Sequence, residues 1–98
     1  MTTRYVKFDV SELLDNDGSI RGFLEDILGS GDAKVIAAGL GDVARARGMT
    51  ELAAKAGLSR ESLYRALSED GNPRLDTLMK VLAALGVKLT VAPQDAAE

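Results

Sequence analysis

The sequence contains no cysteine and no histidine, and this double absence excludes many kinds of functional site. Without cysteine the chain can form neither a disulfide framework nor a thiolate metal site. Without histidine it has no imidazole for a general base, for a catalytic triad or for the usual zinc ligands. The spacing of the carboxylates does not suggest catalysis by acidic residues alone. We therefore expect a protein that is not an enzyme and that holds no metal and no cofactor.

Long apolar runs are also missing from the sequence. No segment approaches the roughly 18 apolar residues that cross a bilayer, and residues 1–16 contain no apolar core of signal-peptide length. These absences lead us to expect a cytoplasmic protein without a membrane partner.

What the chain does contain is typical of one small helical domain. Its 98 residues are 46% apolar and 28% charged, and most of the apolar residues are alanine and leucine, which favour helices over sheets. Patterning and capping residues predict helices over residues 19–28, 33–47, 50–56, 59–67 and 74–85, with Asn72 as the cap and Pro73 in the first turn of the last. Short alternations predict strands at residues 4–9 and 87–91, with an extended arm as the alternative for residues 4–9. Ser11 suits the N-cap of one helical turn.

Two glycines, Gly39 and Gly41, lie inside the longest predicted helix. Each is expected to cost about 1 kcal/mol relative to alanine. Close packing of a neighbouring helix against the glycines is the favoured explanation, and a functional hinge is the alternative.

The negative net charge of −3 is distributed unevenly along the chain. Residues 45–67 carry five basic side chains against two acidic ones, whereas the segments on both sides are acidic. The sequence pI of 4.9 argues against a general binder of polyanions but leaves room for one local phosphate-binding surface.

Residues 50–67, TELAAKAGLSRESLYRAL, have the pattern of two helices joined by a tight turn. Ala53 is small where the helices would cross, and Gly57 permits the left-handed conformation that leaves the first helix. Ser59 can cap the second helix, and Leu63 and Leu67 face inward. The pattern predicts a helix-turn-helix unit.

With its flanking segments, this unit resembles the Xre/Cro-like helix-turn-helix family of phage-repressor type. It is most similar to the branch of addiction-module antidote proteins, which are HigA-like antitoxins. The resemblance covers about residues 6–92 and rests on four segments: Phe8–Glu12, Gly41–Met49, Gly57–Leu67 and Gly71–Pro73.

The resemblance implies a mainly α fold, namely a five-helix Xre/lambda-repressor-like bundle with an extra N-terminal helix and short terminal β-strands. Residues 1–31 would form an acidic arm and helix, residues 32–86 the DNA-binding domain, and residues 87–98 a strand and tail. It also implies an antitoxin that neutralises a RelE/ParE-like toxin and represses their shared operon as a homodimer. A plain transcription regulator without a toxin, and an interaction module that has lost DNA binding, are the alternatives.

The resemblance also assigns DNA contacts to motif positions, with the recognition helix reading bases of the operator. Arginine can pair with guanine and glutamate with cytosine, while hydroxyl and lysine side chains can hold phosphates. A solvated helix face is the alternative for the arginines, with or without pairing to Glu61 or Glu69. Tyr64 could instead pack against the loop at residues 72–73. The expected DNA-binding residues are Thr50, Lys55, Ser59, Arg60, Glu61, Ser62, Tyr64, Arg65, Asn72 and Arg74.

A second surface could meet the toxin, which is expected to be basic because it handles RNA. Asp9 to Asp32 contains seven acidic residues against Arg21 alone, and such a surface would suit a basic partner. The expected toxin-binding residues are Phe8, Asp9, Glu12, Leu13, Leu14 and Phe23. Acidic residues that merely maintain solubility, or toxin binding through the C-terminal strand, are the alternatives. The strand at residues 87–91 could pair within the chain or with its twin in a dimer.

Overall fold

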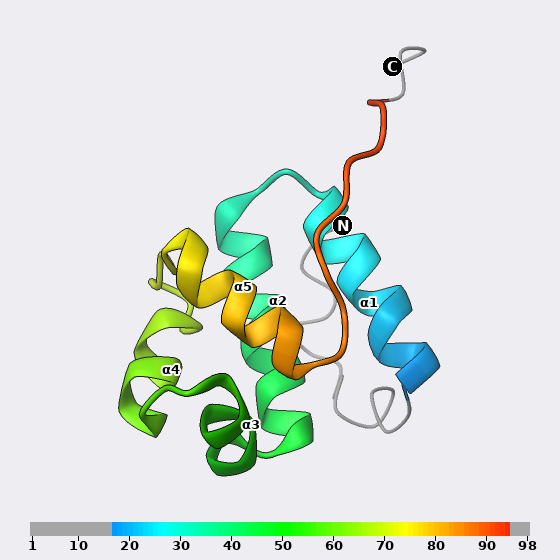
Figure 1. Cartoon of the computed structure of the whole chain (residues 1–98). Coiled ribbons are helices and arrows are strands. Elements are labelled where there is room, and N and C mark those ends of the chain that lie inside the picture. Colours follow the sequence, from blue (N-terminus) through cyan, green and yellow to red (C-terminus); the bar gives the residue numbers. More distant parts are fainter. Residues whose placement is uncertain (1–16, 95–98) are drawn as a thin grey trace.

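The computed structural model describes residues 17–94, and every regular element in that range is a helix. Figure 1 shows their arrangement. The five helices are α1 (Asp17–Gly29), α2 (Ala33–Arg47), α3 (Met49–Ala56), α4 (Arg60–Ala66) and α5 (Leu75–Ala84). The prediction of a mainly helical fold is confirmed. The expected strand at residues 4–9 and the helical turn at Ser11 lie outside the described residues.

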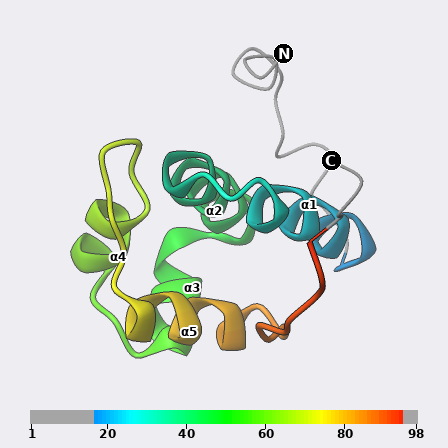
Figure 2. The same ribbon diagram turned by 90° about the horizontal axis from the view of Figure 1, so that it is seen from above.

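Helix α3 is central to the packing, because it contacts α2, α4 and α5. Helix α1 packs against α2, and Figure 2 shows these two helices on one side of the molecule with α5 on the other. Leucine and valine side chains from several helices fill the space between them, and the largest fully buried ones are Leu40, Val43, Leu63, Val81 and Leu82. Ile20, Leu24 and Ile27 join this same core from α1, so α1 belongs to the bundle.

The two interior glycines of α2 allow neighbouring segments to approach closely, as the sequence indicated. A Cβ atom on Gly39 would lie 2.7 Å from the Cδ1 atom of Ile27 in α1. A Cβ atom on Gly41 would meet the backbone carbonyl oxygen of Leu67 at the end of α4. The close-packing explanation is therefore confirmed, with a helix as the neighbour of Gly39 and a helix end as the neighbour of Gly41.

The expected strand over Val87–Val91 is not formed, so this prediction is wrong for the single chain. Residues 87–94 run as an extended segment without strand pairing, and Val91 is 97% exposed. The alternating side chains predicted a local conformation, but a strand also needs a second segment whose backbone can pair with it. No described segment supplies one.

The start of α5 also differs from expectation. Helix α5 begins at Leu75, with Arg74 as its N-cap, so Asn72 and Pro73 precede the helix and do not open it. The helix predicted over residues 19–28 is present as α1 and extends over Asp17–Gly29.

Side-chain caps are present at the starts of α2 and α4, and the one at Ser59 was predicted from the sequence. The carboxylate of Asp32 accepts hydrogen bonds from the backbone N–H groups of Lys34 and Val35. The hydroxyl of Ser59 accepts one from the backbone N–H of Ser62 at 3.0 Å. Each bond satisfies an N–H group that has no partner within its own helix.

We expect Ser59→Ala to lower the free energy of unfolding by about 1 kcal/mol, because the cap bond to the N–H of Ser62 is lost. Urea denaturation followed by circular dichroism measures the change. Ser62→Ala is the matched control, since it removes an exposed hydroxyl of the same helix and keeps the cap. Equal stability of the two variants would contradict a stabilising cap.

Candidate nucleic-acid interface

Helices α3 and α4 are held in a fixed orientation by a three-residue turn and a shared apolar contact. Gly57 adopts the left-handed conformation (φ 73°, ψ 30°), and the backbone N–H of Leu58 donates to the carbonyl of Ala53 at 2.9 Å. Leu63 and Leu67 anchor α4, with exposed fractions of 0% and 2%. The turn and the inward leucines predicted from the sequence are confirmed, and they determine which side of α4 faces outward.

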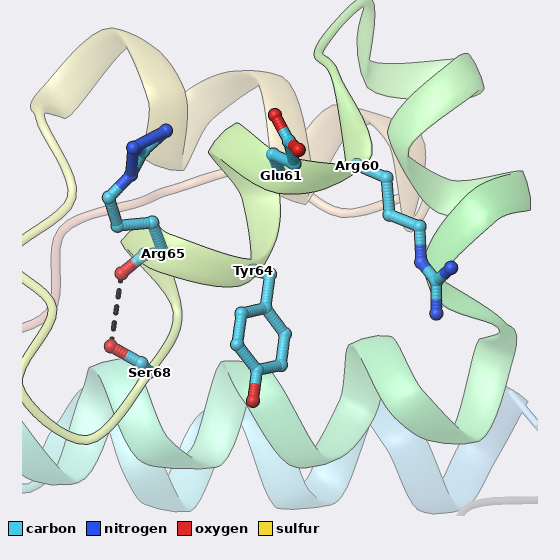
Figure 3. A pocket seen from close by; sticks show the side chains of 5 residues that line it. All are labelled: Arg60, Glu61, Tyr64, Arg65 and Ser68. Atoms are coloured by element: carbon cyan, nitrogen blue, oxygen red, sulfur yellow. Dashed lines mark hydrogen bonds between the residues drawn. The ribbon is translucent and has the colours of Figure 1, made fainter.

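The outward side of α4 presents a surface pocket lined by Arg60, Glu61, Tyr64, Arg65 and Ser68 (Figure 3). These positions recur at helical spacing, so their side chains share one face of the helix and its continuation. In Figure 3, Arg60 and Tyr64 extend in one direction from the helix, and Glu61 and Arg65 in another. Four of the expected DNA-binding residues are therefore brought together at one site.

Ser68 lines the same pocket and was not among the expected site residues. Its hydroxyl donates a hydrogen bond to the backbone carbonyl of Arg65 at 3.0 Å. The position lies four residues after Tyr64, so helical spacing could have identified it. The predicted helix ended at Leu67, and for that reason the next position was not considered.

The arginines of the pocket differ from Arg45 and Arg74 in their electrostatic surroundings. Arg45 pairs with Asp42 at 2.6 Å, and Arg74 pairs with Asp76 at 3.3 Å. Arg60 and Arg65, by contrast, form no ion pair with any residue between 17 and 94. Within the described residues, glutamates therefore do not neutralise these two arginines, and a solvated helix face stays the alternative to DNA contact.

Tyr64 is largely free of contacts with the rest of the fold, with an exposed fraction of 63%. Packing against the loop at residues 72–73, which was the alternative for this ring, would leave it far less exposed. The phenol therefore offers an aromatic surface and a hydroxyl group between the two arginines of the pocket.

The remaining expected DNA-binding residues lie outside the pocket. Thr50 and Lys55 are exposed on α3, and Ser62 is exposed on α4. The hydroxyl of Ser59 is used as a helix cap. Asn72 and Arg74 lie between α4 and α5. Asn72 is exposed, and Arg74 donates from Nε to the carboxylate of Asp76.

Of the expected toxin-binding residues, only Phe23 lies within the described range. It is half-buried on α1 and packs against the apolar core, and so part of its ring already has a structural role. Phe8, Asp9, Glu12, Leu13 and Leu14 lie outside the described residues.

Two other kinds of site are absent from residues 17–94. No group of three or more acidic side chains there is arranged to hold a metal ion. None of the helices in that range has the length and apolar character needed to span a membrane.

Comparisons with known proteins place these features in a family. Residues 4–93 match the family model described as "Probable addiction module antidote protein". An uncharacterised protein of Haemophilus influenzae is 45% identical over 91 residues, which cover 93% of this chain and 94% of that protein. No solved structure matches the chain significantly. Because the family model and this relative both span nearly the whole sequence, the chain belongs to the family of addiction-module antidote proteins.

Proposed function

We propose that this protein is the antitoxin of a type II toxin–antitoxin module, and that it binds its own operator as a homodimer through an Xre-like helix-turn-helix formed by α3 and α4. Membership of an antidote family implies a toxin partner and a regulatory, non-enzymatic role. In the proposed mechanism, α4 enters the major groove, and the second α4 of the dimer enters the next major groove about 34 Å away.

The observation that carries the DNA-binding proposal is the pair of unneutralised arginines on the outward face of α4. A guanidinium group that is not paired with a carboxylate can form two hydrogen bonds to guanine O6 and N7, or can bind a phosphate. Arg60 and Arg65 are both exposed and lie on either side of Tyr64 along the helix. Their helix is short and held by buried leucines, so its outward face is presented in one orientation.

The other residues of the pocket suit supporting roles in this proposal. Glu61 can accept a hydrogen bond from cytosine N4, which would compensate for its repulsion from the phosphates. The hydroxyl groups of Tyr64, Ser62 and Thr50 can donate to phosphate oxygens, and so can the ammonium group of Lys55. Within residues 32–86, the proposed interface thus combines base contacts from α4 with backbone contacts from α3.

The proposed toxin is RelE/ParE-like and basic, and charge complementarity supports its binding to the acidic N-terminal side of the chain. Glu25 and Asp26 are exposed on α1, and five further acidic residues lie between Asp9 and Asp32. An acidic surface attracts a basic partner and orients its approach. Phe23, which is half-buried among them, could supply an apolar contact.

We expect Arg60→Ala/Arg65→Ala to weaken binding to the chain's own promoter by about 10- to 100-fold, because two cationic contacts are lost. A mobility-shift titration at several salt concentrations measures the change. The dependence of the affinity on salt should also become shallower, since fewer phosphate counterions are released.

The matched control is Lys34→Ala/Lys88→Ala, which removes the same two charges from exposed positions outside α4. It should bind almost as tightly as the native chain. If the native chain gives no shift at any salt concentration, DNA binding is excluded and an interaction module remains. If both variants weaken binding equally, net charge and not the α4 face is responsible.

The toxin half of the proposal is tested by co-expression with the product of the neighbouring reading frame. A small basic protein that arrests growth alone, and that is tolerated and co-purified with this chain, is the expected result. A neighbour that is harmless when expressed alone would favour a plain transcription regulator.

A further inference from the structure

Helix α5 exposes two large apolar side chains that the proposed DNA and toxin surfaces do not use. Leu75 is 66% exposed and Met79 is 53% exposed, although both lie within a regular helix whose opposite side is buried. Residues four apart lie side by side on a helix, so the two form a continuous apolar stripe, which exposed Ala83 extends by one turn.

No segment within residues 17–94 covers this stripe. Figure 2 shows α5 along the edge of the molecule that lies opposite α1 and α2, and α3 contacts it there. The other large apolar side chains exposed within residues 17–94 lie elsewhere, since Tyr64 is on α4 and Leu89 and Val91 are in the extended C-terminal segment. Adjacent large apolar side chains exposed on one face of a helix are typical of a surface that becomes buried in an assembly.

The charges beside the stripe are self-complementary. Asp76 and Lys80 lie four residues apart along the same edge of it, and both are exposed. Oδ1 of Asp76 accepts from Arg74 of the same chain at 3.3 Å, and the half-exposed carboxylate can also meet a lysine of a second copy. When two copies of one helix pair antiparallel about a twofold axis, the same surface meets itself, and position 76 of one copy faces position 80 of the other. The two contacts related by the axis would then both join opposite charges, while the apolar residues meet between them.

We propose that α5 is the homodimer interface, pairing antiparallel with α5 of a second copy. The partner is a second copy and not the basic toxin, because Arg74 and Asp76 pair with each other and Lys80 remains as excess positive charge on this side of α5, which would repel a basic protein. The proposed function requires a dimer, and this surface would form it, so the inference rests on the proposed function. The α5 interface is an alternative to a dimer in which residues 87–91 of two copies pair as strands.

The first test is the association state of Leu75→Glu/Met79→Glu, measured by analytical ultracentrifugation over a range of concentrations. Both side chains are more than half exposed, and so their replacement should leave the fold intact, as circular dichroism would verify. A twofold interface contains each substitution twice, and we expect the dimer Kd to rise by about 100-fold or more. The matched control, Leu89→Glu/Val91→Glu, places the same charges in the extended segment and should leave the Kd unchanged.

A charge exchange tests the antiparallel geometry itself. Asp76→Lys and Lys80→Asp, made separately, should each raise the Kd by roughly tenfold, because each places like charges opposite one another at two symmetric contacts. Made in an Arg74→Ala background, which removes the intrachain pair with Asp76, the variant carrying both exchanges should recover the affinity of Arg74→Ala alone. Failure of that recovery would overturn the antiparallel pairing.

Two further outcomes separate this inference from the proposed function. If Leu89→Glu/Val91→Glu dissociates the dimer and Leu75→Glu/Met79→Glu does not, the α5 interface is overturned, while operator binding by the native chain would still support the proposed function. A native chain that stays monomeric at all concentrations also overturns it. The α4 variant Arg60→Ala/Arg65→Ala should lose DNA affinity while remaining dimeric, so loss of DNA binding alone does not count against the α5 interface.

Discussion

Gly41→Ala should lower the free energy of unfolding by about 2–3 kcal/mol, although alanine normally stabilises the interior of a helix. The added methyl group would meet the backbone carbonyl oxygen of Leu67, and a backbone atom cannot move aside as a flexible side chain can. Either α2 or the end of α4 must therefore shift. A loss of this size is a large part of the roughly 5–15 kcal/mol that stabilises a typical domain.

Two other glycines provide graded controls for this prediction. Gly22 lies on α1 with no atom within 4 Å of the place that an added methyl group would take, so Gly22→Ala should stabilise the chain by about 0.5–1 kcal/mol. Gly39→Ala should fall between the two, because the side chain of Ile27 can give way more easily than a backbone carbonyl. Urea denaturation of the three variants measures the order, and a Gly41→Ala chain as stable as Gly22→Ala would contradict the close approach.

Leu63→Ala should lower the free energy of unfolding by about 3 kcal/mol or more, because it removes a fully buried side chain and leaves a cavity in the core. Within the seven residues of α4, Leu63 is the one that is completely enclosed. Its truncation loosens the contact that holds α4 against the core. We therefore also expect weaker operator binding, even at temperatures where the variant remains folded.

Thermal and urea denaturation measure the stability of this variant, and a mobility shift on the same sample measures its DNA affinity. Leu89→Ala is the matched control, because it makes the same truncation at a side chain that is 43% exposed and should change stability by less than about 1 kcal/mol. A Leu63→Ala chain with native stability would show that α4 is not held by this contact. Native stability with reduced affinity would instead indicate a direct effect on the interface.

The inward and outward sides of α4 could be assigned from sequence because they depend on local spacing. The four-residue interval between Leu63 and Leu67 indicated the buried side, and Gly57 and Ser59 indicated where the turn ends and the helix begins. These features follow from the helical period and from capping chemistry, which operate within a few residues of one another.

The expectations that were wrong concerned contacts with distant segments or the beginning of a helix. The alternation over residues 87–91 satisfies the local condition for a strand, but pairing requires a second segment at hydrogen-bonding distance, and the described residues provide none. Asn72 and Pro73 have the composition of a helix start, yet α5 begins two residues after Pro73. The residue types near the start of a helix do not determine the residue at which the helix begins.

The amino-acid sequence by itself determined the mainly helical fold, the turn between α3 and α4, and the absence of thiol and imidazole chemistry, because these depend on residue type and short-range periodicity. Only the tertiary structure decided that Gly41 is closed off by the carbonyl of Leu67, that Arg60 and Arg65 have no carboxylate partner in the described chain, and that Leu75 and Met79 remain exposed. Each of these depends on which segments meet in space, and helical spacing specifies the face of a helix but not what covers it.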